Sequence, residues 1–279
     1  MPIHDQGYRR YAGHRVLAGR SWWVIARAGI LERLRERRFL GLLLLAWAPF
    51  VVRAVQIYVA TNFSQASFLA PTAQTFREFL GQQGFFVFLV TIFVGSGLIA
   101  NDLRANALQI YLSKPLTRAE YIVGKLATLV VFLVLVTWMP AILLLFLQMM
   151  FAGSGAFVRA NLFLIPAITL FSVIQVALSS CVMLALSSLS RNRRFVAIMY
   201  AGIVFFTAAM YQALRGMTGS TAWAWISPRD TLNVVGDGIF RVPGASALPF
   251  PVALAVLLAL LAGSIWIVMR HVRGVEVVA

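Results

Sequence analysis

Six long runs of apolar residues are the feature of this sequence that most constrains its fold. They cover roughly residues 39–60, 79–100, 122–150, 162–189, 195–214 and 248–269. Each run is long enough to cross about 30 Å of hydrocarbon as a helix. Apolar residues make up 61% of the chain, whereas a soluble domain contains roughly 45–50%. The sequence therefore predicts an all-α membrane protein with six transmembrane helices.

The chain divides into two predicted regions, a cytoplasmic N-terminus with an interfacial helix at 1–38 and a six-span domain at 39–279. Between Arg20 and Arg38, apolar and charged side chains fall on opposite sides of a helix, as in helices that lie in the membrane surface. The apolar side is Trp23, Ile30, Leu31 and Leu34, and the charged side is Glu32, Arg35 and Glu36. A basic anchor without further role fits the same pattern.

Basic residues are distributed unevenly between the loops. Of the 24 lysines and arginines, 18 lie before the first run, in 101–125, in 190–194 or in the C-terminal tail. Because basic residues concentrate on the cytoplasmic side, both termini are predicted to be cytoplasmic. The net charge of +15 is spread between apolar runs rather than along one face, so lipid explains it and nucleic acid does not. We expect a multi-pass protein of the cell membrane, and specifically of the bacterial inner membrane.

The predicted spans lack the residues that ion-driven or catalytic membrane proteins use. They contain no Asp, Glu or His, and the only cysteine is Cys181, so neither a proton relay nor a metal site is expected. Gly124-Lys125 is followed by Leu126 and lacks a glycine-rich turn, so it is not a phosphate-binding loop. We expect no enzyme activity and no cofactor in this chain. Sodium coupling through carbonyls and hydroxyls stays open.

The polar segment 101–125 between the second and third runs has a pattern of its own. Asn101-Asp102 is suited to cap a helix, and Leu103, Ala107, Ile110 and Tyr111 would then share one face. Pro115 ends this helix, and Thr117 with Glu120 forms a capping box for the next one. The pattern predicts a short amphipathic helix at 102–112, which either lies in the headgroups or docks against a partner.

This segment resembles the first cytoplasmic loop of ABC-2-type permeases, the membrane subunits of one group of ABC transporters. The resemblance is carried by Gly97, Asp102, Leu112-Ser113-Lys114-Pro115, Thr117-Arg118, Tyr121, Gly124 and Lys125. In that family the loop is the coupling helix, an elbow helix precedes the first span, and short external helices precede the last. The resemblance places six residues on the ATPase-facing element: Asp102, Leu103, Arg104, Ala107, Leu108 and Tyr111.

The same resemblance implies an ATP-driven transporter in which this chain is the permease subunit and has no ATP site of its own.

ATP and Mg²⁺ would be bound by a separate ATPase, present in two copies, and a second permease copy would complete a homodimer or a related heterodimer. We expect an exporter, with drug, lipid, glycan and metal-related substrates all open. The loop is somewhat closer to that of permeases linked to copper-enzyme maturation. The rival hypothesis is a non-transporting scaffold or assembly factor that recruits a soluble protein.

Further features of the sequence carry expectations. Apart from Lys125, which is counted with the loop 101–125, Arg53 is the only charge inside a predicted span. It either reaches outer headgroups or faces a pathway or partner. Ser227-Pro228-Arg229-Asp230 predicts a short helix in the last outer loop to about residue 235, broken by Gly236, Gly238, Pro243 and Gly244. It is either one of the external helices of the resembled family or a plain surface helix. Prolines 49, 140 and 166 are expected to kink spans. The fourth span is rich in serine, which favours close helix packing over a polar path; the residues are Ser172, Ser179, Ser180, Ser187 and Ser188.

Overall fold

The computed structural model describes residues 21–63, 72–107, 117–151, 162–244 and 246–272. These residues form helices and turns, with no strand among them. The helices are α1 (Ser21–Leu34), α2 (Arg37–Ala46), α3 (Ala48–Asn62), α4 (Ala73–Val90), η2 (Thr91–Gly95), α5 (Ala100–Arg104), α7 (Arg118–Val136), α8 (Trp138–Phe151), α10 (Leu164–Leu189), α11 (Arg193–Thr218), η3 (Ala222–Ile226), α12 (Pro228–Ile239) and α13 (Phe250–His271). The prediction of an all-α membrane protein is confirmed.

Six helical segments in the described part of the chain are long and apolar enough to cross a membrane. They are Arg37–Asn62, Ala73–Arg104, Arg118–Phe151, Leu164–Leu189, Arg193–Thr218 and Phe250–His271. Each matches one predicted run, but most extend further at one or both ends. The second segment therefore also includes Glu78 and Asp102, which lie just outside the predicted run 79–100.

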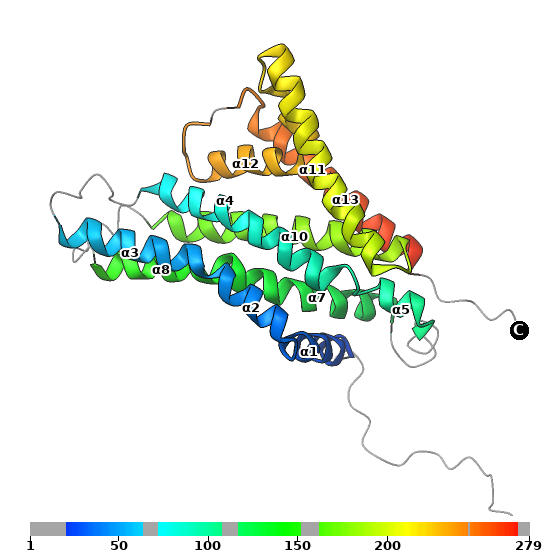
Figure 1. Ribbon diagram of the computed structural model, residues 1–279. Helices are drawn as coiled ribbons and strands as arrows, with labels where there is room; N and C mark the ends of the chain where they lie inside the picture. The colour runs from blue at the N-terminus through cyan, green and yellow to red at the C-terminus, as the bar shows by residue number, and fades with distance from the viewer. Residues whose placement is uncertain (1–20, 64–71, 108–116, 152–161, 245, 273–279) are drawn as a thin grey trace, which may run out of the picture.

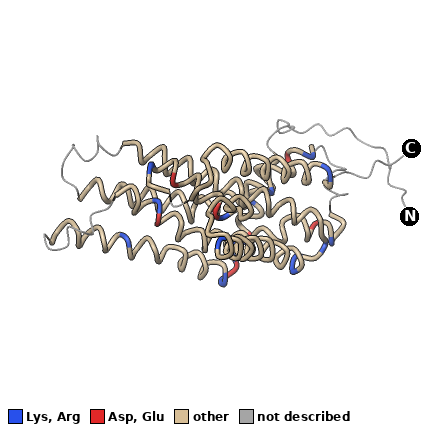
Figure 2. The backbone as a smooth tube through the Cα atoms, turned by 90° about the horizontal axis from the view of Figure 1, so that it is seen from above, with Lys and Arg blue, Asp and Glu red and all other residues tan. Residues whose placement is uncertain are grey.

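The interior of the bundle is made by three of these segments. In α4, α7–α8 and α10, 50–61% of the most apolar window is buried, compared with 17–22% in the α2–α3, α11 and α13 segments. Helix α10 contacts α4, α7, α8 and α13, and it lies among these helices in Figure 1. Most of the backbone is free of charged residues, as Figure 2 shows. The peripheral helices therefore present apolar surfaces of the kind that lipid covers.

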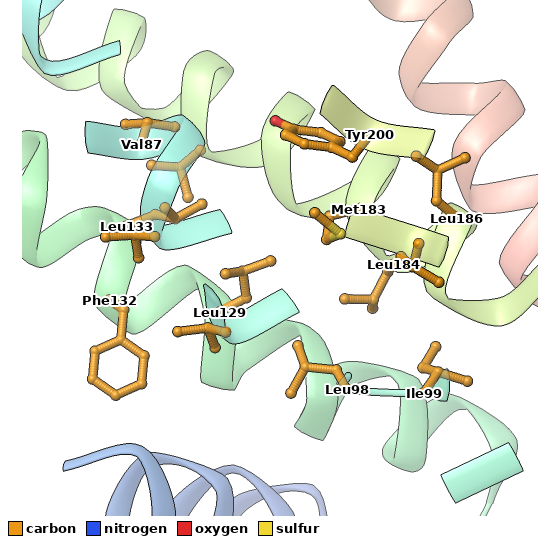
Figure 3. Packing of buried hydrophobic residues seen from close by; sticks show 14 of the residues in the cluster. Val87, Leu98, Ile99, Leu129, Phe132, Leu133, Met183, Leu184, Leu186 and Tyr200 are labelled. Atoms are coloured by element: carbon orange, nitrogen blue, oxygen red, sulfur yellow. The ribbon is translucent and has the colours of Figure 1, made fainter. Parts of the chain in front are cut away.

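Two apolar clusters fill the bundle, and one of them surrounds the segment that the sequence singles out. Figure 3 shows this cluster, in which Leu98 and Ile99 approach Leu129 of α7 and Leu184 of α10. Ile99 and Leu129 are fully buried. The residues that lead into α5 are thus part of the packed interior and not of a surface loop.

Proline accounts for two of the helix breaks. Helices α2 and α3 separate at Trp47, two residues before Pro49, and α7 and α8 separate at Thr137, three residues before Pro140. A proline lacks the N–H that would bond to the carbonyl four residues earlier, which opens the helix there. Pro166 does not act in this way, because it lies in the first turn of α10 where no such bond is needed.

Helix α1 packs across α7 through small residues. Figure 1 shows α1 nearly end-on beside α7, and a Cβ added at Gly124 would lie 2.8 Å from Ile25 Cβ. Ala26 is fully buried on the same face of α1. The predicted apolar side is not the packing side, since Trp23 and Leu31 are 51% and 45% exposed. These exposed apolar side chains are free to contact lipid.

Candidate functional site

The second span is interrupted just before the segment that resembles a coupling loop. A π-helical turn, η2, ends at Gly95, and α5 begins at Ala100. The fully buried hydroxyl of Ser187 on α10 accepts hydrogen bonds from the backbone N–H of Ile99 (3.1 Å) and of Ala100 (3.0 Å). It also donates to the carbonyl of Ser96 at 3.2 Å. Because backbone groups inside a membrane need protein partners, this serine stabilises the interruption.

The far end of α5 is held by α7. One carboxylate oxygen of Asp102 accepts a hydrogen bond from the Tyr121 hydroxyl at 2.7 Å. The same oxygen forms an ion pair with Lys125 Nζ at 2.6 Å. The side chains of Asp102 and Lys125 are only 16% and 15% exposed. The Lys125 ammonium also lies over the Tyr121 ring, 5.6 Å from its centroid. Helix α5 is therefore attached to α10 at its start and to α7 near its end.

The six predicted ATPase-facing residues have different environments. Arg104 is exposed, Ala107 is half-buried, and Leu103 packs partly against the apolar cluster of Figure 3. The Asp102 carboxylate faces α7, where it pairs with Lys125, and is not directed away from the chain. Leu108 and Tyr111 lie outside the described residues. The structure thus leaves Arg104 as the accessible charged residue of α5.

The predicted helix caps have mixed outcomes. Asn101-Asp102 does not cap a helix, because α5 begins one residue earlier, after Ile99, and the Ser187 hydroxyl takes the place of a cap. Asn106 then adopts a positive φ of 52°, a conformation that asparagine tolerates better than most residues. The capping box at Thr117 and Glu120 is confirmed, with bonds of 3.0 and 3.2 Å between side chain and backbone.

A cavity of about 320 Å³ lies between α1, α5 and α7. Its polar lining includes Glu32, Arg33, Asn101, Asp102 and Lys125, and its apolar lining includes Val24, Ile25 and Leu98. It is therefore a mixed polar and apolar pocket next to the α5 attachment. Composition did not indicate it, because its walls come from three segments that are distant in the sequence.

A second buried charge cluster lies at the opposite end of α4. Arg77 Nε donates to Asp237 Oδ1 at 2.9 Å, and Arg77 Nη2 donates to the carbonyl (2.9 Å) and the side-chain oxygen (3.0 Å) of Asn233. The guanidinium also lies 5.2 Å from the centre of the Phe171 ring. Burial raises the pKa of Asp237, and the charge of Arg77 acts in the opposite direction. Arg77 thereby fixes α12 to α4 and α10.

Helix α12 begins as predicted but ends later. The Ser227 hydroxyl accepts a hydrogen bond from the backbone N–H of Asp230 at 3.3 Å, and the helix continues to Ile239. Gly236 and Gly238 do not break it. A Cβ at Gly236 would lie 2.6 Å from both Arg77 Nε and Phe171 Cε2. A glycine at position 236 allows Arg77 and Phe171 to approach the α12 backbone closely. Local helix propensity does not predict this role.

Arg53 is engaged within the chain. Its Nη1 donates to Gln56 at 3.0 Å and its Nη2 to Glu78 of α4 at 3.3 Å. The Arg53 side chain is 14% exposed, whereas that of Glu78 is 49% exposed. Glu78 lies in α4, within the candidate span Ala73–Arg104, so Arg53 is not the only charged residue in the candidate spans. It links the first and second spans near the end where α12 lies.

Neither the models of protein families nor the curated proteins include a match to the chain. Within the described residues, no group of three or more His, Cys, Asp or Glu side chains is arranged to hold a metal ion.

Proposed function

We propose that this chain is an ABC-2-type permease, the membrane subunit of an ATP-driven exporter. A separate ATPase, bound near α5, would supply the energy, and a second permease copy would form the other half of the pathway. Both termini and α5 would then face the cytoplasm, and the protein would lie in the bacterial inner membrane. The observation that carries the proposal is the double attachment of α5 to α10 and α7.

The attachment involves residues that also carry the family resemblance. Asp102, Tyr121 and Lys125 form one contact network, and Gly124 allows α1 to approach α7. A loop that only rested in the headgroups would not need a buried ion pair to the next span, because isolated charges there remain solvated. The network therefore favours a role in which the position of α5 relative to α7 is important.

A displacement of α5 by a bound ATPase would reach two interior helices. The Ser187 bonds would pass it to α10, and the Asp102 ion pair would pass it to α7. The π-helical turn in front of α5 offers a place where α4 can bend without moving as a whole. At the other end, α12 is fixed to α4 and α10 by Arg77, which suits a closure of the external side. The substrate class stays open.

Photocrosslinking from the accessible end of α5 tests the proposal. A photoreactive amino acid replaces Arg104, and a matched control replaces Arg229 at the external helix. Capture of a protein that binds and hydrolyses ATP is expected from position 104 alone. If position 104 captures only proteins without ATPase activity, the scaffold hypothesis is favoured and the permease proposal fails.

Mutation of the predicted coupling face gives a second measurement. Truncating a buried interface anchor typically costs more than about 2 kcal/mol, while rim charges cost little. Leu103→Ala together with Tyr111→Ala is expected to weaken ATPase copurification, and Lys114→Ala to leave it unchanged. Normal ATPase association of the double variant, at normal membrane levels, would contradict the assigned roles.

A further inference from the structure

The cavity between α1, α5 and α7 contains a buried arginine with spare donors. Arg33 is 6% exposed, and its one hydrogen bond within the described residues goes from Nη1 to Glu36 at 2.6 Å. A guanidinium carries five N–H groups, and Arg33 lines the cavity. No Arg33 nitrogen is among the fully buried side-chain atoms that lack a partner in the described residues, so its remaining donors open to the cavity. The cavity therefore offers an anion-binding group that the described residues do not fully use.

The other charged residues of the cavity make its lining neutral overall. Lys125 is paired with Asp102, which leaves two ammonium hydrogens for another acceptor. Glu32 is exposed and has no partner in the described part of the chain. Two cations and two carboxylates thus line the cavity. This pattern suits a zwitterion better than a polyanion.

The apolar side of the cavity indicates where such a zwitterion comes from. Val24 lines the cavity and is 66% exposed, and the neighbouring Trp23 is 51% exposed. Both side chains lie on α1, which crosses α7 beside the cavity. Apolar residues beside a charged pocket at a helix end match the boundary between acyl chains and headgroups.

We propose that this cavity binds one phospholipid with a primary ammonium headgroup, such as phosphatidylethanolamine. Its phosphate would accept hydrogen bonds from Arg33 and Lys125, and its ammonium would donate to Glu32. Its chains would lie along Val24 and the exposed side of α1. A choline headgroup is bulkier and has no N–H to donate, so it is bound less well. The proposal does not depend on the transporter function.

Native mass spectrometry of the purified protein, exchanged into nanodiscs of stated lipid composition, measures the binding. Wild-type protein is expected to retain one phosphatidylethanolamine per chain, in preference to phosphatidylcholine by about tenfold, as a charge-assisted hydrogen bond allows. Glu32→Gln should remove this preference, and Arg33→Gln should reduce retention of both lipids. Arg35→Gln, on the same helix but exposed, is the matched control and should behave as wild type.

A variant that keeps every charge guards against loss of folding. Ala28 lines the cavity and is exposed, so Ala28→Phe should fill the space and lower retention of both lipids without changing thermal stability. Equal retention of the two lipids by wild-type protein, or unchanged retention by both Arg33→Gln and Ala28→Phe, would refute the proposal. If glycerophosphoethanolamine, which has no chains, binds as well as the lipid, the site is one for a soluble phosphate ester and the lipid assignment is wrong.

Discussion

Replacing Gly236 by alanine should loosen helix α12. The added Cβ would lie 2.6 Å from Arg77 Nε and 2.6 Å from Phe171 Cε2, well inside the usual contact distance of about 3.5–4.0 Å. Overpacking of this kind costs about 1–3 kcal/mol. Alanine gains about 0.5–1 kcal/mol over glycine within a helix. A net loss of up to about 2.5 kcal/mol is expected, because Arg77 is held by Asn233 and Asp237 and cannot simply move aside.

Thermal unfolding of the purified protein measures this loss. A net change of this size should lower the Tm by a few degrees, at roughly 2–4 °C per kcal/mol for a chain of this size class. Hydrogen exchange should rise in α12 before it rises in α10. The matched control is Gly202→Ala in α11, where nothing lies within 4 Å of the added Cβ. That variant should be as stable as wild type or slightly more so.

Two results would refute this reasoning. If Gly236→Ala unfolds at the wild-type temperature and its α12 exchanges at the wild-type rate, the close approach of Arg77 and Phe171 does not constrain position 236. If Gly202→Ala destabilises the protein as strongly, the effect is not specific to the contact. Either outcome would remove the argument that Gly236 is present for close packing.

Three further predictions concern topology, Arg53 and the α5 attachment. Cysteines placed at Ser113 and Ser220 in a cysteine-free background should label from opposite sides of the membrane, and labelling of both in intact cells by an impermeant reagent would contradict the topology. Arg53→Leu should cost less than about 1 kcal/mol, because its partner on α4 is half exposed, and a much larger fall in thermal stability would show a further role. Ser187→Ala should cost about 1–3 kcal/mol and speed amide exchange at the start of α5, since two buried N–H groups lose their acceptor. Ser188→Ala should change neither quantity much, because that hydroxyl only donates to a backbone carbonyl of its own helix; equal effects of the two variants would contradict the assignment.

Features that depend on neighbouring residues could be predicted from the sequence. The six spans follow from apolar length alone. The capping box at Thr117 and Glu120 joins residues three apart, and so does the bond between Ser227 and Asp230. In each case both partners lie in one turn, so residue type and spacing decide the geometry.

Features that depend on another helix could not be predicted in this way. Ser187 bonds to Ile99 and Ala100, which are 88 and 87 residues away, and its place in a serine-rich span indicated only close packing. Gly236 was predicted to end a helix because its local propensity is poor, yet its packing against Arg77 decides its role. The sequence around Arg77 did not indicate its pairing with Asp237, because it showed only that the arginine lies near a span. Tertiary contacts set all three roles.

The pairing of Arg77 with Asp237 has a consequence for how the protein is made. The two residues are 160 positions apart, and a ribosome adds about 5–20 residues per second, so Asp237 emerges roughly 8–32 s after Arg77. During that interval the second span is already synthesised while its arginine lacks its carboxylate partner. An early release into lipid would leave this charge at the membrane boundary, dependent on water or on the insertion machinery. The contact between α4 and α12 can therefore form only after α12 has been made, so the second span must still be able to adjust its position at that time.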